Sequence, residues 1–192
     1  EMSTLLNLSN DDFIRTTEQR HNKSVQAFWK ILEDKDQIYL SKYSGWYSVR
    51  DEAFVADNEI VEKDGKKYNS FGSELTFVEE ESYFFRLSYW QKSLLKLFDE
   101  NPDFIVPKTR FNEVRRFIES GLKDLSVSRT TFNWGIKVPT NPDHIIYVWL
   151  DALTNYISAL GFPDIKDKNF IKFWPGIHVV GKDIIRFHAV FW

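Results

Sequence analysis

Hydrophobic side chains return along this chain at two different spacings, and each spacing predicts a different kind of element. In residues 16 to 34 they recur at helical intervals, and Thr16 and Gln19 have the spacing of a capping box, so an amphipathic helix is predicted there. Residues 88 to 99 and 109 to 120 predict two further helices, each with one apolar stripe. Burial in a core explains all three stripes.

Between residues 38 and 85 the hydrophobic period changes from helical spacing to two. Short aromatic and β-branched runs alternate there with turn residues, which predicts antiparallel strands. Asp64 and Gly65 separate two of these runs, and both residues tolerate the positive φ of a type I′ turn, so a hairpin is predicted at this point. A small antiparallel β lobe is therefore expected to interrupt a chain that is otherwise helical and α/β.

The last third of the chain predicts two strand-turn-helix units. Residues 145 to 150 form a continuous apolar run, which is typical of a strand buried on both faces of a parallel sheet, and Asp151 then caps a helix that ends at Gly161. Residues 177 to 180 predict a second buried strand, with a turn and a helix from Ile184 after it. Ligands bind at the carboxyl ends of such strands, so we expect a site near these two turns.

Composition narrows the class of protein. The 192 residues are 43% hydrophobic, enough for one large domain or two small ones, and the absence of cysteine excludes disulfides and thiolate zinc sites. The apolar runs are far shorter than the roughly 18 residues of a membrane span. The first residues also lack the pattern of a secretory signal. We therefore expect a globular, cytoplasmic protein without a membrane-spanning segment.

Charge is spread unevenly around a net value of -3. Residues 50 to 83 carry 10 acidic and 4 basic side chains, whereas residues 84 to 135 carry 9 basic and 6 acidic ones. Arg110, Arg115 and Arg116 are predicted on the more exposed sides of one helix, where they could meet backbone phosphates. Ordinary solvated surface explains the same pattern, so both interpretations stay open.

One phosphate-binding motif can be set aside. Residues 176 to 183 have the spacing of a P-loop, but Asp183 replaces the Ser or Thr that would hold magnesium, and the four intervening residues predict a strand rather than a loop. What remains is a turn in which Gly181 lets a ligand approach the backbone. Asp183 could accept hydrogen bonds from ribose hydroxyls or simply cap its helix.

An aromatic slot is predicted beside this turn. Ala152 and Tyr156 lie four residues apart on one helical face, and Trp149 precedes them, so a small residue separates two large rings. Ile184 and His188 are also four apart and could close over the same slot. Packing in an aromatic core is the simpler explanation of these residues when they are taken alone. The four histidines have no metal-ligand spacing, and no nucleophile elbow is present.

Seven segments, in order, carry a resemblance to a known family. They are Phe13-Ile-Arg-Thr-Thr17, His21, Tyr43-Ser-Gly-Trp-Tyr-Ser-Val-Arg-Asp-Glu-Ala-Phe54, Asn112-Glu-Val114, Asp124-Leu-Ser-Val-Ser-Arg129, Val148-Trp-Leu-Asp-Ala152 and Val180-Gly-Lys-Asp-Ile-Ile-Arg-Phe-His188. Together they resemble the methionyl-tRNA synthetases, a family of class I aminoacyl-tRNA synthetases. The resemblance runs from about residue 13 to the last residue.

The resemblance implies an α/β fold in which an insert interrupts a Rossmann-type catalytic domain with a partial parallel sheet. Residues 1 to 42 would be a helical part of that domain, residues 43 to 85 the antiparallel connective-peptide insert, and residues 86 to 128 the helices that return to the domain. Residues 129 to 192 would form the Rossmann-type half with the pocket. Many relatives bind zinc in the insert through cysteines, so a chain without cysteine implies a metal-free insert.

The resemblance also assigns site residues. The methionine pocket would consist of Trp149, Ala152, Leu153, Tyr156, Ile184, His188 and Trp192. Tyr156 and His188 would be its polar tips, and Leu153 departs from the proline of some relatives. ATP would bind at Gly181, Lys182 and Asp183, and Arg129 matches a position near the reaction centre.

The activity implied is that of a cytoplasmic, monomeric ligase that activates methionine with ATP and Mg²⁺ and transfers it to tRNA(Met). The class I signatures His-Ile-Gly-His and Lys-Met-Ser-Lys-Ser are absent from the 192 residues, and Trp192 falls inside a predicted helix. We therefore interpret the chain as an internal fragment that is inactive by itself. The alternative is a non-catalytic module that binds RNA or protein through residues 110 to 116.

Overall fold

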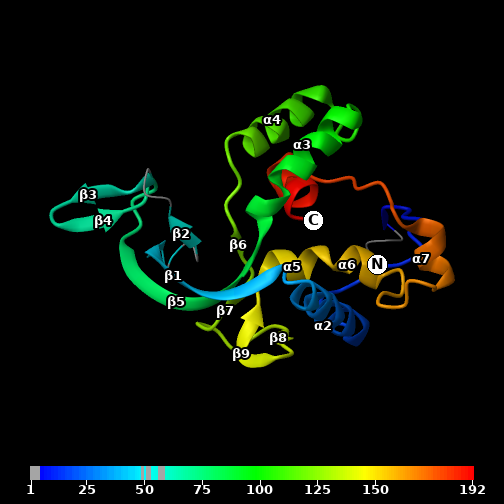
Figure 1. Cartoon of the computed structure of the whole chain (residues 1–192), viewed down its shortest axis with the longest axis horizontal. Helices are drawn as coiled ribbons and strands as arrows, with labels where there is room; N and C mark the ends of the chain where they lie inside the picture. The colour runs from blue at the N-terminus through cyan, green and yellow to red at the C-terminus, as the bar shows by residue number, and fades with distance from the viewer. Residues whose placement is uncertain (1–4, 49, 51–52, 56–58) are drawn as a thin grey trace.

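The computed structural model describes residues 5 to 48, 50, 53 to 55 and 59 to 192, as a mixed α/β structure with a protruding β lobe (Figure 1). Ten residues lie outside the described part of the chain. They are residues 1 to 4, at the start of the predicted helical part, and residues 49, 51, 52 and 56 to 58, in the predicted insert. Among the described residues no helix has both the length and the apolar character needed to cross a membrane.

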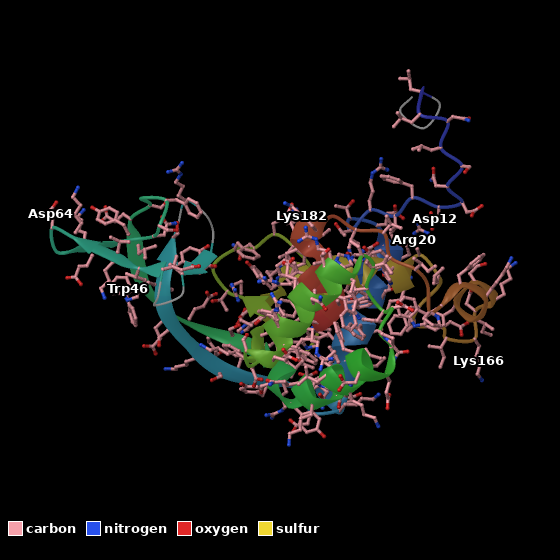
Figure 2. All side chains as sticks on the ribbon, turned by 90° about the horizontal axis from the view of Figure 1, so that it is seen from above. Asp12, Arg20, Trp46, Asp64, Lys166 and Lys182 are labelled. Atoms are coloured by element: carbon pink, nitrogen blue, oxygen red, sulfur yellow. The ribbon has the colours of Figure 1, made fainter. Side chains whose placement is uncertain are left out.

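Helix α2 (Gln19–Asp34) begins three residues later than predicted. Its N-cap is Glu18, which makes no side-chain cap hydrogen bond, so the predicted capping box at Thr16 is wrong. The Glu18 carboxylate instead accepts from the backbone N–H of Arg15 at 2.9 Å, and Arg20 pairs with Asp12 at 2.6 Å (Figure 2). These exposed contacts hold the chain in an irregular approach to the helix, and they involve residues other than the Thr16 and Gln19 of the predicted capping box.

The β lobe is built on one long antiparallel pair. Strand β1 (Ile38–Ser48) pairs with β5 (Leu75–Phe85) along their full length, and β2 (Ala53–Val55) and β6 (Leu125–Ser126) complete the sheet order β2-β1-β5-β6. Strands β3 (Val61–Lys63) and β4 (Lys66–Tyr68) form the hairpin at its tip. Asp64 has φ 52° and Gly65 has φ 74°, which confirms the predicted hairpin turn. Trp46 and Asp64 lie in this lobe, well apart from Lys182 (Figure 2).

The predicted helical pair is confirmed. A 3₁₀ turn, η2 (Leu87–Trp90), leads into α3 (Gln91–Glu100), and α4 (Lys108–Glu119) follows. The α4 stripe of Phe111, Val114 and Ile118 is buried together with Phe98 of α3, and Gly121 with φ 100° follows the end of α4. Val190 belongs to the same core cluster, so this pair supports the C-terminal segment, as Figure 1 shows.

A second antiparallel sheet replaces the first predicted strand-turn-helix unit. Its strands are β7 (Ser128–Arg129), β8 (Lys137–Val138) and β9 (Asn141–Ile146), in the order β7-β9-β8. The prediction of a strand over residues 145 to 150 is wrong beyond Ile146, because α5 (Val148–Leu153) begins there and Asp151 lies inside it rather than at its cap. A short apolar run does not distinguish a strand from a helix by period, and here it contains both.

The second predicted unit is also corrected. After α6 (Asn155–Ser158) and α7 (Lys168–Phe173) the chain is extended, but Ile177 and Val179 are 96% and 95% exposed, and no described strand pairs with them. Every strand pair among the described residues is antiparallel, so the predicted parallel pairing is not found there. The predicted helix from Ile184 is a 3₁₀ turn, η3 (Lys182–Ile184), followed by a π-helix, η4 (Phe187–Phe191).

Candidate active site

Helices α5 and α6 follow each other so closely that residues 148 to 158 form one short rod, here called the α5–α6 rod. Thr154 joins them with helical φ and ψ of -61° and -15°, and its hydroxyl donates to the carbonyl of Leu150 at 2.7 Å. At 3.6 residues per turn, Trp149, Ala152 and Tyr156 share one face of this rod. The predicted face of the slot therefore exists, although a helix rather than a strand carries Trp149.

The two predicted polar tips meet. The Tyr156 hydroxyl lies 2.7 Å from Nε2 of His188, and Nδ1 of His188 lies 2.9 Å from the carbonyl oxygen of Ile184. Because a carbonyl only accepts, Nδ1 carries the proton of the neutral ring and Nε2 accepts from the tyrosine. Burial raises the pKa of Tyr156 above its ordinary value of 10, which keeps the phenol protonated as a donor.

Aromatic rings form the wall of the site. Trp149 stacks on Phe187 with ring centroids 3.4 Å apart and planes 9° apart, so the α5–α6 rod contacts the C-terminal segment next to His188. Trp192 lies 6.5 Å from the Tyr156 ring and 5.7 Å from that of Phe28. Of these rings, the sequence analysis did not select Phe187 and Phe28, because their contacts join elements far apart in the chain.

The other residues predicted for the methionine pocket differ in how far they are buried. Ala152 is half-buried, Ile184 is 37% exposed, and Leu153 is buried at 4% exposure. Trp149, Leu153 and Trp192 line an apolar cavity of about 550 Å³ that reaches toward α2 and α3 and whose lining does not include Tyr156 or His188. Three of the predicted pocket residues thus line an apolar space that the two polar tips do not reach.

The residues predicted for ATP are on the surface. Gly181, Lys182 and Asp183 are all exposed, and a Cβ at Gly181 would meet nothing within 4 Å, so its backbone is open to a ligand. The N-cap of η3 is Gly181, with no side-chain cap hydrogen bond, so the alternative that Asp183 caps this helix is wrong.

Arg129 lies at the start of the α5–α6 rod. Its guanidinium donates to the Ser128 carbonyl at 2.7 Å and to the Ser126 hydroxyl, and it sits 4.0 Å from the centre of the Tyr147 ring. Tyr147 immediately precedes α5, so Arg129 is placed beside the helix that carries Trp149. Its role near the reaction centre stays a prediction.

Two of the three α4 arginines that could meet phosphates pair with carboxylates. Arg115 pairs with Asp99 at 2.6 Å and with Glu119 at 2.9 Å, and Arg110 pairs with Glu113 at 2.6 Å. A phosphate would have to compete with these carboxylates. The pairing weakens the alternative of a binding module on α4.

His178 is a component of the site that the sequence analysis did not select. Its ring meets Tyr156 edge to face at 4.3 Å and lies 6.1 Å from His188. Its Nδ1 is buried and has no hydrogen-bond partner among the described residues. Burial, and the nearby His188, lower the pKa of His178 below its ordinary value of 6.5. The ring of His178 and the phenol of Tyr156 are therefore uncharged at pH 7.

The stability of the full-length protein is expected to fall between pH 7 and pH 5 through His178. Because the pKa of His178 is lower in the folded state, the unfolded chain binds more protons at this ring, and stability is lost as the pH drops below about 6.5. His178→Phe keeps a ring against Tyr156 and should make the free energy of unfolding depend less on pH in this range. Denaturant unfolding at pH 7, 6 and 5 measures that free energy for both proteins. An equal loss of stability with falling pH in the wild type and the variant would contradict the prediction.

Comparison with known proteins identifies the family of this chain. The family model described as tRNA synthetases class I (M) matches residues 1–192, so the chain belongs to the class I tRNA synthetases. Within that class it is similar to the methionine–tRNA ligases of Rhizobium meliloti (strain 1021), at 59% identity, and of Rickettsia typhi (strain ATCC VR-144 / Wilmington), at 58%. Both matches cover 100% of this chain and 37% of the relative, so the chain spans little more than a third of their length.

A solved structure gives the same result. The Mycobacterium tuberculosis methionyl-tRNA synthetase bound by methionyl-adenylate matches with a TM-score of 0.90 and 50% identity, over 100% of this chain and 38% of that one. The resemblance stated from the sequence and the α/β class I fold are thereby confirmed, although the described strands of this chain are antiparallel.

Proposed function

We propose that the longer protein containing this chain is a methionine–tRNA ligase. It would join methionine to ATP as methionyl-adenylate and pass the methionyl group to tRNA(Met). The observation that carries the proposal is the Tyr156–His188 hydrogen bond of 2.7 Å beside the stack of Trp149 on Phe187. The similarity of the whole chain to methionine–tRNA ligases supports it.

The site suits the side chain of methionine. That side chain is unbranched, polarizable and uncharged, and its sulfur gains about 0.3–1.5 kcal/mol from contact with an aromatic ring. Rings at positions 149, 156 and 192 would supply such contacts, while the protons of the Tyr156 hydroxyl and of His188 Nδ1 are already donated within the protein and fix the two side chains in place. A charged side chain would lose its hydration here without a partner, which costs several kcal/mol. The neutral aromatic slot therefore favours methionine over charged amino acids.

The nucleotide would lie at residues 181 to 183. The open backbone at Gly181 allows close approach, the Asp183 carboxylate can accept hydrogen bonds from ribose hydroxyls, and Lys182 adds a positive charge for a phosphate. ATP would enter as its Mg²⁺ complex, which is the substrate. Together with Arg129 these groups position the reactants, since phosphoryl chemistry depends mainly on positioning and charge stabilisation.

The reaction would proceed in two displacements. The methionine carboxylate attacks the α-phosphorus of ATP, forms a new P–O bond and releases pyrophosphate. A ribose hydroxyl at the tRNA end then attacks the activated carbonyl and releases AMP. The class I signature motifs that stabilise the phosphates are absent from the 192 residues, so we assign that step to other parts of the protein.

The chain organisation supports the same proposal. The β lobe leaves the body at Ile38 and returns at Phe85, which pair with each other, so the lobe can be an insert without breaking the helices on either side. We propose residues 43 to 85 as a metal-free connective-peptide insert between residues 1 to 42 and 86 to 128, with 129 to 192 as the half that binds methionine and ATP. A monomeric, cytoplasmic state stays a prediction.

ATP–pyrophosphate exchange tests the function. The full-length protein is expected to show exchange that depends on methionine and not on leucine or glutamate, and then to esterify tRNA(Met). Residues 1 to 192 alone are expected to show no exchange. Exchange that another amino acid stimulates while methionine does not would overturn the proposed function, and exchange by the isolated segment would refute only its predicted inactivity.

A further inference from the structure

One buried histidine outside the slot holds the α5–α6 rod at two points. His21 of α2 has no exposed surface; its Nε2 lies 2.6 Å from Oδ1 of Asp151 and its Nδ1 lies 3.1 Å from Oγ of Ser158. Because a carboxylate only accepts, Nε2 donates to Asp151. The two partners belong to α5 and α6 respectively, so a single imidazole connects α2 to both halves of the rod.

The two contact points define one face of the rod. Asp151 and Ser158 are seven residues apart, which is close to two helical turns, so they lie on the same side. Trp149 and Tyr156 each precede one of them by two residues, which places them about 160° around the axis. The face held by His21 is therefore nearly opposite the face that carries Trp149 and Tyr156. Because the rod is rigid, fixing its rotation about its own axis at one face also fixes the direction in which Trp149 and Tyr156 point.

A second side-chain hydrogen bond from α2 reaches this region without ending on the rod. Among the described residues, the remaining hydrogen bond from an α2 side chain to this region is that of Ser24, whose hydroxyl donates to the carbonyl of Phe162 at 2.5 Å. Phe162 follows the end of the rod, so a hydrogen bond to its backbone carbonyl does not fix the rotation of α5 about the helix axis. Ser24 is as fully buried as His21, which makes it a matched control for burial in the same interface.

We propose that His21 is a positioning residue for the methionine site, acting through Asp151 and Ser158 to set the rotation of the α5–α6 rod. It does not touch the substrate; it determines how Trp149 and Tyr156 face the C-terminal segment. This inference rests on the proposed function. It goes beyond it by assigning a role in amino acid binding to a side chain on the far side of the rod.

The first test uses exchange kinetics of the full-length protein. His21→Ala removes both contacts, and because misplacing binding groups by about 1 Å can cost about 100-fold, the KM for methionine is expected to rise at least about tenfold. The KM for ATP should stay within about twofold, since residues 181 to 183 lie on another segment. His21→Gln can still donate to Asp151 and should recover most of the loss, whereas Ser24→Ala should change neither KM.

A second measurement separates this inference from the proposed function. In protein labelled with 5-fluorotryptophan, Trp149→Phe identifies the ¹⁹F resonance of Trp149, and His21→Ala is expected to shift it while Ser24→Ala does not. If His21→Ala does not fold, Ser158→Ala removes one contact and should give a smaller shift in the same direction. An unmoved resonance, or an unchanged methionine KM in active His21→Ala protein, overturns the role of His21. Absent methionine-dependent exchange in the wild type overturns the function instead.

Discussion

Replacing Trp149 by alanine in the full-length protein is expected to lower kcat/KM for methionine by about 30- to 150-fold. The change removes a ring that stacks on Phe187 at 3.4 Å and lines the apolar cavity. Truncating a tryptophan that anchors a binding site costs about 2 kcal/mol or more of binding free energy, and we take about 2–3 kcal/mol here because Trp149 is half-buried, which gives that range of rates. ATP–pyrophosphate exchange at several methionine concentrations measures it.

Two variants serve as controls for Trp149. Trp149→Phe keeps a ring that can stack on Phe187, so we expect it to retain most of the activity. Trp134 is 78% exposed and lies between β7 and β8, so Trp134→Ala should leave kcat/KM nearly unchanged. Equal losses in Trp149→Ala and Trp134→Ala would show that the stacked indole does not form the amino acid site.

Replacing Tyr156 by phenylalanine is expected to lower kcat/KM for methionine by about 5- to 30-fold. The ring stays, but Nε2 of His188 loses the hydroxyl that lies 2.7 Å away. Water can solvate the freed Nε2 while the site is empty but is displaced when methionine binds, so the unpaired acceptor costs about 1–3 kcal/mol on binding, and the lower part of that range applies because His188 is half-buried. The same exchange assay measures the loss, with Tyr89→Phe, a change at a tyrosine that is 72% exposed, as the matched control.

A double-mutant cycle decides whether the pair acts as a unit. If Tyr156 and His188 work through their hydrogen bond, adding His188→Ala to Tyr156→Phe should cost less than the sum of the two single changes. Strict additivity would mean that each side chain contributes separately. That outcome would remove the hydrogen bond as the basis for selecting methionine.

Sequence patterns predicted the elements whose conformation depends on near neighbours. The Asp64-Gly65 turn follows from the positive φ that these two residues tolerate, and the stripe of α4 follows from the helical period of its apolar side chains. The same approach was wrong for residues 145 to 150, where β9 ends and α5 begins inside one apolar run. Period alone carries no information about such a boundary, because the backbone hydrogen-bond partners come from other elements.

The site shows the same division. The spacing of four residues along a helix led us to select Ala152 with Tyr156, and Ile184 with His188. The structure then brings Tyr156 and His188 into hydrogen-bond contact. Phe187 and His178 were missed, since each is defined by a ring on a distant element. For His21 a signal existed, because it is one of the segments shared with the family. Its partners could not be inferred, as they lie 130 and 137 residues away.

By itself the sequence determined the family, the residues able to form a neutral aromatic slot, and the helices and hairpin that local spacing specifies. Only the tertiary structure decided how those residues meet: which face of the α5–α6 rod turns toward the C-terminal segment, which histidine nitrogen accepts from Tyr156, and that residues 177 to 180 have no described strand beside them. The reason is that propensity and period act over a few residues along the chain, whereas hydrogen bonds and ring contacts between distant elements depend on how the whole molecule packs.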